Sequence, residues 1–127
     1  MNRKVVSPTD MFAAGPYSHA VWGGTGAVLY LSGKTGTDSA GKLVGPGITE
    51  QTRQTFANLK LVLEAAGLSF ANVKKCNVYL TDMADFAAMN AVYAEHFEAP
   101  QPARTTVAVA ALPGGAKVEI EMVAAQL

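Results

Sequence analysis

Only two segments of this 127-residue chain carry the periodicity of an amphipathic helix, and they lie among several β-rich runs. The first covers residues 49–66 and is followed by Gly67, which suits the left-handed backbone that ends many helices. The second follows Asp82, a capping residue, and stops before Pro100. Its apolar positions are Phe86, Met89, Tyr93 and Phe97. The chain must therefore fold mainly from strands, with two helices packed against them.

The β-rich runs surround these helices in the order β-β-α-β-α-β-β. They cover residues 18–22, 27–32, 73–80, 104–112 and 117–124, preceded by a short apolar N-terminal pair. Glycines at 23–26 predict a hairpin between the first two runs, and Pro113-Gly114-Gly115 predicts another between the last two. Residues 34–47 predict one long polar loop. No linker or repeat divides the chain, so residues 1–127 are expected to form a single domain.

Two helices cannot cover both faces of such a sheet, and right-handed crossovers place both on one side. Alternation in the last two runs defines two sets of side chains. The apolar set, Thr105, Val107, Val109, Val118, Ile120 and Met122, is predicted to face the helices. The alternate set, Arg104, Thr106, Ala108, Lys117, Glu119 and Glu121, is predicted to share the uncovered face with Tyr30. We interpret that face as one buried against further copies of the chain.

Charge and cysteine content exclude several classes of protein. Ten basic and ten acidic residues give no net charge, and the basic residues are scattered, which argues against nucleic acid and against an anionic membrane surface. Residues 11–33 carry no charge, but repeated glycines and Pro16 interrupt the segment and predict strands and turns in place of a membrane span. The single Cys76 and the absence of a signal-peptide core predict a reducing, cytoplasmic location.

Several familiar motifs fail on their spacing. Ser32-Gly33-Lys34-Thr35 ends like a phosphate-binding loop, but Val28 stands where the first glycine belongs. His19, His96 and Cys76 lack the paired spacing of metal ligands, so no metal is expected. Cys76 falls on the apolar face of its run, which predicts a small buried side chain and no nucleophile.

Arg104 and Glu119 are the remaining candidates for chemistry. If the last two runs form a hairpin, both side chains lie on one face and could form a cross-strand salt bridge. Alternatively, the guanidinium could bind a substrate carboxylate while the carboxylate orients or deprotonates a water. Tyr17, after Gly15-Pro16, could lie over such a site or pack in its own turn.

Several stretches of the chain resemble the Rid family of reactive-intermediate deaminases, also called the YjgF family. They are Gly15-Pro16-Tyr17-Ser18-His19-Ala20, Leu31-Ser32-Gly33, QTFANLKLVLEAAG at 54–67, VYLTDMADF at 78–86, Pro102-Ala103-Arg104-Thr105-Thr106-Val107 and Val118-Glu119-Ile120-Glu121. The resemblance implies an α+β, chorismate-mutase-like fold with one mixed sheet and two helices on one face. It also implies a homotrimer with a central barrel of sheets and active sites in clefts between subunits.

The same resemblance implies a hydrolase of the 2-iminobutanoate/2-iminopropanoate deaminase type, acting on enamines and imines such as 2-aminoacrylate and releasing 2-oxo acids and ammonia. It implies no cofactor. Arg104 corresponds to the carboxylate-binding arginine and Glu119 to the water-positioning glutamate, with Tyr17 beside them. Ser32, Gly33 and Thr106 correspond to substrate-binding positions.

Three points remain open at the level of sequence. Many family members carry Gln at the position of Lys34 and Cys at that of Thr106, so an added cation near the cleft could favour a second carboxylate in the substrate. Hairpin counting places Glu121 opposite Arg104, whereas the resemblance selects Glu119. A carboxylate-binding module without turnover, and an endoribonuclease or translation inhibitor, are the alternative functions.

Overall fold

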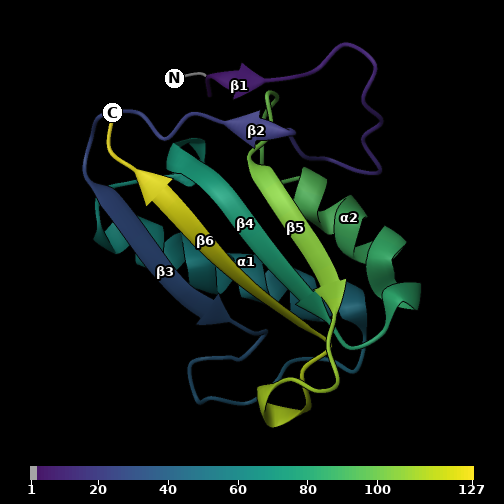
Figure 1. The fold of residues 1–127 in the computed structure, drawn as a ribbon. Helices are drawn as coiled ribbons and strands as arrows, with labels where there is room; N and C mark the ends of the chain where they lie inside the picture. The colour runs from purple at the N-terminus through teal and green to yellow at the C-terminus, as the bar shows by residue number, and fades with distance from the viewer. Residues whose placement is uncertain (1–2) are drawn as a thin grey trace.

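The computed structural model describes residues 3–127 as a four-stranded sheet with two helices on one side and a separate pair of short strands (Figure 1). The elements are β1 (Val5–Val6), β2 (Ala20–Val21), β3 (Val28–Lys34), α1 (Ile48–Ala65), β4 (Val73–Leu80), α2 (Phe86–Ala94), β5 (Ala103–Ala108) and β6 (Val118–Ala125). Short 3₁₀ turns lie at Phe70–Asn72, Met83–Asp85 and Pro113–Gly115. This is the α+β architecture that the sequence predicts.

The strands of the main sheet follow the order β3-β6-β4-β5, and this order overturns both predicted hairpins. β4 and β5 are parallel and are joined through α2, so β5 takes one edge of β4. β6 is antiparallel to both β4 and β3 and takes the other edge, which leaves β4 between β5 and β6. Two parallel strands need a long crossover connection, which α2 provides between β4 and β5. This crossover sets the place of β5, so the short Pro-Gly-Gly segment does not form a hairpin between β5 and β6.

The first predicted hairpin fails for a similar reason. β2 pairs with β1, where Val5 lies opposite Val21, and the C-terminal strand occupies the edge of β3. A Cβ at Gly26 would lie 2.3 Å from the carbonyl oxygen of Gln126, so the end of the chain fills the space beside this turn. β2 and β3 therefore pair with β1 and β6, respectively, and do not pair with each other.

The first helix agrees with the sequence at its C-terminal end, whereas its N-terminal cap is Gly47, with the predicted cap Thr49 inside the helix, and the second helix is shorter. Gly67, two residues beyond α1, has φ +73°, and the Leu68 N–H donates to the Leu63 carbonyl at 2.9 Å, which satisfies an end carbonyl. The Asp82 carboxylate accepts from the Ala84 N–H at 2.9 Å, so it caps the 3₁₀ turn that leads into α2. Phe97 belongs to the core but lies beyond the end of α2.

The core lies between the sheet and the helices. Its most enclosed members are Phe56, Leu59 and Leu63 of α1, Met89 and Tyr93 of α2, Val73, Cys76, Val78 and Leu80 of β4, and Val118, Ile120, Met122 and Ala124 of β6. Full burial of each larger apolar side chain contributes about 1.5–3 kcal/mol to folding. Cys76 is buried, as predicted, and burial raises the pKa of its thiol to about 12.

Neither helix in residues 3–127 has the length and apolar character to cross a membrane.

The face prediction is right for β6 and reversed for β5. Val118, Ile120 and Met122 are buried beneath the helices, as expected. In β5, however, Arg104 lies opposite Cys76 and Thr106 opposite Val78, so this set faces the helix side. Alternation defines two sets of side chains, but it does not say which set a sheet edge turns toward its helix.

No helix of residues 3–127 covers the other face of the sheet, which faces the viewer in Figure 1. Three of its apolar side chains are strongly exposed: Tyr30 at 78%, Val28 at 49% and Val107 at 42%. The face also carries Glu119 and Glu121, because each alternates with a buried residue of β6. We refer to it below as the open face.

Candidate functional site

Arg104 projects from β5 toward α2 and is enclosed by aromatic rings. Its guanidinium carbon lies 4.9 Å from the ring centre of Tyr93, 5.4 Å from that of Tyr17 and 5.6 Å from that of Phe86. Its Nη1 donates to the Oδ1 of Asn90 at 2.7 Å. These contacts hold the guanidinium by cation–π interactions and one neutral hydrogen bond.

No carboxylate neutralises this guanidinium within residues 3–127. The single ion pair formed there within 4.0 Å joins Arg53 and Glu95 at the surface, and Asn90 is the sole hydrogen-bond acceptor of Arg104 among those residues. A guanidinium has five N–H groups, so most donors of Arg104 are left for another partner. Burial lowers the pKa of Arg104, although it remains a cation at neutral pH. A withdrawn cation with free donors is suited to binding an anion.

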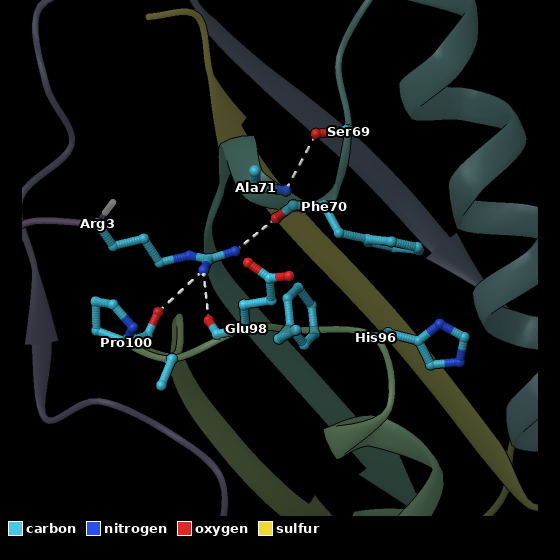
Figure 2. Close-up of a pocket in the computed structure, with 9 residues that line it drawn as sticks. Arg3, Ser69, Phe70, Ala71, His96, Glu98 and Pro100 are labelled. Carbon is cyan, nitrogen blue, oxygen red and sulfur yellow. Dashed lines mark hydrogen bonds between the residues drawn. The ribbon is translucent and has the colours of Figure 1, made fainter. Parts of the chain in front are cut away.

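Arg3, whose guanidinium carbon lies 5.4 Å from the ring centre of Phe97, shows the opposite arrangement (Figure 2). Its Nε donates to the Val73 carbonyl at 2.6 Å, its Nη1 to the carbonyls of Glu98 and Pro100 at 3.3 and 3.0 Å, and its Nη2 to that of Phe70 at 2.5 Å. A cavity of about 360 Å³ borders this residue. Because main-chain carbonyl oxygens accept hydrogen bonds from Arg3, its side chain links separate segments of the fold and has few N–H groups left for a ligand.

Tyr17 reaches Arg104 because its loop runs alongside β5. Ser18 forms a parallel bridge with Ala103, and its N–H donates to the Pro102 carbonyl at 3.0 Å. A Cβ at Gly15 would lie only 3.0 Å from Nη2 of Arg104, so the backbone of this loop packs closely against the guanidinium. The structure thus brings together the predicted Tyr17 and Arg104.

Thr106 lies two residues beyond Arg104 on the same side of β5. Its hydroxyl is buried and has no hydrogen-bond partner within residues 3–127. His19 packs edge-on against Tyr17, with ring centres 5.9 Å apart, at the margin of this group. We call Arg104, Tyr17, Thr106 and Asn90 the arginine group.

Glu119 belongs to a second group on the open face. It lies opposite Tyr79 of β4 and against Gly33 of β3, where a Cβ would be 2.1 Å from its Oε2. The β3–β6 pairing is irregular between Leu31 and Lys34, which places Gly33 and the exposed Ser32 beside β6. We call Glu119, Ser32 and Gly33 the glutamate group.

Glu121, the other candidate glutamate, is already engaged. Its Oε1 accepts from Asn77 Nδ2 at 3.1 Å and from the Tyr79 hydroxyl. This bond to Glu121 is also the main reason that the pKa of Tyr79 is raised. Within residues 3–127 the carboxylate of Glu119 accepts no hydrogen bond that meets the usual geometry. Side-chain chemistry therefore agrees with the choice of Glu119, which hairpin counting opposed. An open groove of about 390 Å³ borders both glutamates and Tyr79.

The predicted pairing of Arg104 with Glu119 is wrong within one chain. β4 separates their strands, and adjacent strands lie about 4.8 Å apart, so the backbones are about 10 Å apart across the sheet. In addition, Arg104 lies on the helix side and Glu119 on the open face. Neither the cross-strand salt bridge nor a shared site can form between these two side chains of a single copy.

The predicted influence of Lys34 on the cleft is also not supported. Lys34 lies opposite Ile120, whose side chain is buried under the helices, so the register turns Lys34 away from Glu119. The irregularity at Ser32 and Gly33 causes this change of face, because an extra residue in one strand reverses the alternation that follows it.

Asn90 is the site residue that sequence reasoning missed. It stands within the apolar helix α2, between Met89 and Ala91. Asparagine is a poor helix former, because its side chain competes for backbone hydrogen bonds. A half-buried asparagine in that position is a signal that could have drawn attention to it.

Among residues 3–127, no group of three or more His, Cys, Asp or Glu side chains is placed to hold a metal ion.

Residues 3–127 thus form a small α+β fold in which an aromatic-lined arginine without a carboxylate partner lies on one side of the sheet and a glutamate without a hydrogen-bond donor lies on the other. The chain also matches the family model described as "Endoribonuclease L-PSP" over residues 8–126. It belongs to this family, the Rid (YjgF) family that its motifs resemble.

Relatives and solved structures agree with this assignment. The chain is 47% identical over 126 residues to a mouse protein named 2-iminobutanoate/2-iminopropanoate deaminase, covering 98% of this chain and 92% of the relative. It is 43% identical to the human protein of that name, covering 98% and 90%. A crystal structure of a Yersinia pestis protein of the conserved Rid family matches with a TM-score of 0.90 and 34% identity, over 99% of this chain and all of the other.

Proposed function

We propose that this protein hydrolyses reactive enamines and imines, such as 2-aminoacrylate and its 2-imino acid tautomer, to 2-oxo acids and ammonia. The observation that carries the proposal is the guanidinium of Arg104, which is withdrawn from solvent and has no carboxylate partner within residues 3–127. Such a cation matches the carboxylate that all 2-imino acids share. The names of the mouse and human relatives point to the same substrates.

For this reaction the enzyme has mainly to position the substrate and the attacking water. The carbon of a protonated imine is electrophilic, so water adds to it and gives a carbinolamine. Once the proton taken from the water reaches the nitrogen of the carbinolamine, the C–N bond breaks, ammonia leaves and the C=O bond forms. Arg104 would hold the carboxylate through a bidentate contact, while the carboxylate of Glu119 orients the water and accepts its proton. Tyr17 would shield the site from bulk water, and Ser32, Gly33 and Thr106 would contact the substrate. No cofactor enters this scheme.

The proposal requires that Arg104 and Glu119 come from different copies of the chain. They occupy opposite faces of one sheet, so a neighbouring copy must supply the second group. The exposed Tyr30, Val28 and Val107 on the open face support such an assembly, because exposed apolar surface of this kind marks an interface. We propose a homotrimer with a barrel of sheets at its centre, one small imino acid in each cleft between subunits, and no nucleic acid or membrane partner.

The direct test generates 2-aminoacrylate with a dehydratase and follows pyruvate formation with and without this protein. Arg104→Ala should remove about 2–4 kcal/mol of transition-state binding and abolish the acceleration. Arg104→Lys should restore little, because an ammonium cannot make the bidentate contact. Arg53→Ala, which loses an exposed ion pair, is the matched control and should keep full activity.

A second comparison in the same assay separates the two glutamates. Glu119→Gln keeps the size of the side chain but removes its charge, and it should lose most activity. Glu121→Gln should lose little, because its carboxylate is engaged by Asn77 and Tyr79. The reverse result would assign the water to Glu121.

The family description also names endoribonuclease activity, and a Thermotoga maritima relative of known structure is titled a putative endoribonuclease. The zero net charge of the chain and its scattered basic residues argue against RNA as a substrate. We therefore expect no cleavage when a labelled RNA is incubated with the protein. Pyruvate binding without any acceleration of imine hydrolysis would instead identify a carboxylate-binding module.

A further inference from the structure

We propose that Asn90 is a positioning residue for the carboxylate-binding arginine. It fixes the Arg104 guanidinium through an uncharged acceptor and so leaves the whole positive charge for the substrate. This inference rests on the proposed role of Arg104 as the carboxylate anchor. It adds Asn90 to the residues of the site and explains why an uncharged amide stands at this position.

The contacts of Arg104 give Asn90 a task that no other residue in 3–127 shares. The rings of Tyr17, Phe86 and Tyr93 restrict where the guanidinium lies, but a ring face does not select one N–H over another. The Asn90 Oδ1, 2.7 Å from Nη1, is directional and fixes the rotation of the guanidinium plane. The remaining N–H groups then point in a defined direction.

The loop over the site adds to this constraint. A Cβ at Gly15 would lie 3.2 Å from Asn90 Nδ2 as well as 3.0 Å from Arg104 Nη2. The backbone at Gly15 therefore packs against both side chains at once, and the amide is enclosed by the loop on one side and α2 on the other. Asn90 is held well enough to orient its partner.

The neutrality of Asn90 is the specific part of the inference. Aspartate has the same shape as asparagine and would accept the same hydrogen bond, and arginine beside aspartate is the common pairing in proteins. An aspartate here would, however, form an internal ion pair with Arg104 and compete with the substrate carboxylate. An amide orients the guanidinium without neutralising it.

The test compares Asn90→Asp with the unsubstituted protein in three measurements. Pyruvate, the expected 2-oxo acid product, serves as the ligand in an NMR titration, and melting temperature and imine hydrolysis are measured in parallel. We expect the Kd for pyruvate and the KM for the imine to rise about tenfold or more, with kcat changing less. The melting temperature should stay the same or rise, because the new ion pair is satisfied.

Two further variants separate positioning from structure. Asn90→Leu removes the acceptor at similar volume and should weaken pyruvate binding less than Asn90→Asp does, since no competing charge is introduced. Ala91→Asp places the same new charge on the exposed side of α2 and should leave binding unchanged. A merely structural Asn90 would give the opposite order, with the isosteric aspartate milder than leucine.

The outcomes also distinguish this inference from the proposed function. Pyruvate binding that Asn90→Asp weakens, in a protein that does not accelerate imine hydrolysis, would support the inference and refute the proposed activity. Active protein whose Asn90→Asp variant binds pyruvate as tightly as before would refute the inference alone. An unsubstituted protein that neither binds pyruvate nor accelerates imine hydrolysis would overturn both.

Discussion

Arg3 and Arg104 are both withdrawn from solvent, and burial lowers the pKa of each guanidinium, yet their surroundings assign them different tasks. Four main-chain carbonyls surround Arg3, from segments that are distant in sequence. Arg104 has one side-chain amide and three aromatic rings. At the scale of single residues, the number of satisfied donors separates a structural arginine from one that is available to a ligand.

Methionine at each position should show this difference. Arg3→Met leaves four carbonyls without their donor and should lower the free energy of unfolding by about 2–4 kcal/mol. Arg104→Met removes an incompletely satisfied cation and should leave that free energy unchanged or higher, while it abolishes imine hydrolysis. Urea unfolding with activity per folded molecule measures both effects. Equal destabilisation by the two substitutions would contradict the assignment.

At the scale of elements, β3 and β6 create the surroundings of Glu119. The irregular pairing between Leu31 and Lys34 brings Gly33 under the glutamate, and the missing side chain makes room for the carboxylate. The same irregularity turns Lys34 toward the helix side. A small change in strand register thus decides which polar groups share the open face.

Gly33→Ala should reduce activity with little effect on stability. The new Cβ would stand 2.1 Å from the present position of Glu119 Oε2, and the end of a flexible side chain can move away cheaply. Displacement of the carboxylate should lower kcat about tenfold or more while the melting temperature changes little. Gly23→Ala, where a Cβ meets no atom within 4 Å, is the control. Unchanged kcat in Gly33→Ala would argue against a role for the Glu119 carboxylate in catalysis.

Periodicity predicted the elements better than it predicted their partners. The extent of α1, the glycine at its end and the buried faces of β4 and β6 follow from local spacing, because a helix or strand face is a property of consecutive residues. Pairing depends on the crossover through α2, which inserts β4 between β5 and β6, and no local pattern carries that information. The separation of Arg104 from Glu119 follows from this strand order together with the opposite faces on which the two side chains lie.

The site shows the same division. Alternation and elimination singled out Arg104, Glu119 and Tyr17, the family resemblance supplied their roles, and the contact between Arg104 and Tyr17 was one of the two expected for that tyrosine. Asn90 was missed because its role depends on the packing of α2 against β5, although an asparagine within an apolar helix was a visible anomaly.

At the scale of the whole molecule, the exposed apolar side chains of the open face favour association with further copies of the chain. The helices α1 and α2 cover one side of the sheet (Figure 1). The other side carries exposed apolar side chains beside two glutamates. Association through this face would bury Tyr30, Val28 and Val107 and bring the arginine group of one copy toward the glutamate group of another.

Light scattering at micromolar concentration should therefore give a mass near three copies of the 13.2 kDa chain. Tyr30→Glu places a charge on the exposed apolar part of the open face and should weaken the assembly, with activity falling in parallel. Leu61→Glu, on an exposed position of α1, is the control. A stable monomer with full activity would contradict the interface.

The central claim is that one site draws Arg104 and Glu119 from different copies, and mixed trimers test it most directly. Arg104→Ala and Glu119→Gln proteins, each inactive alone, are unfolded together in equal amounts and refolded. In the proposed trimer every mixed assembly contains one interface with both residues intact. Random mixing should therefore restore about a quarter of the unsubstituted activity. Recovery near that level is the predicted result, whereas mixtures that form trimers but stay as inactive as their parents would show that the site does not combine these residues across subunits.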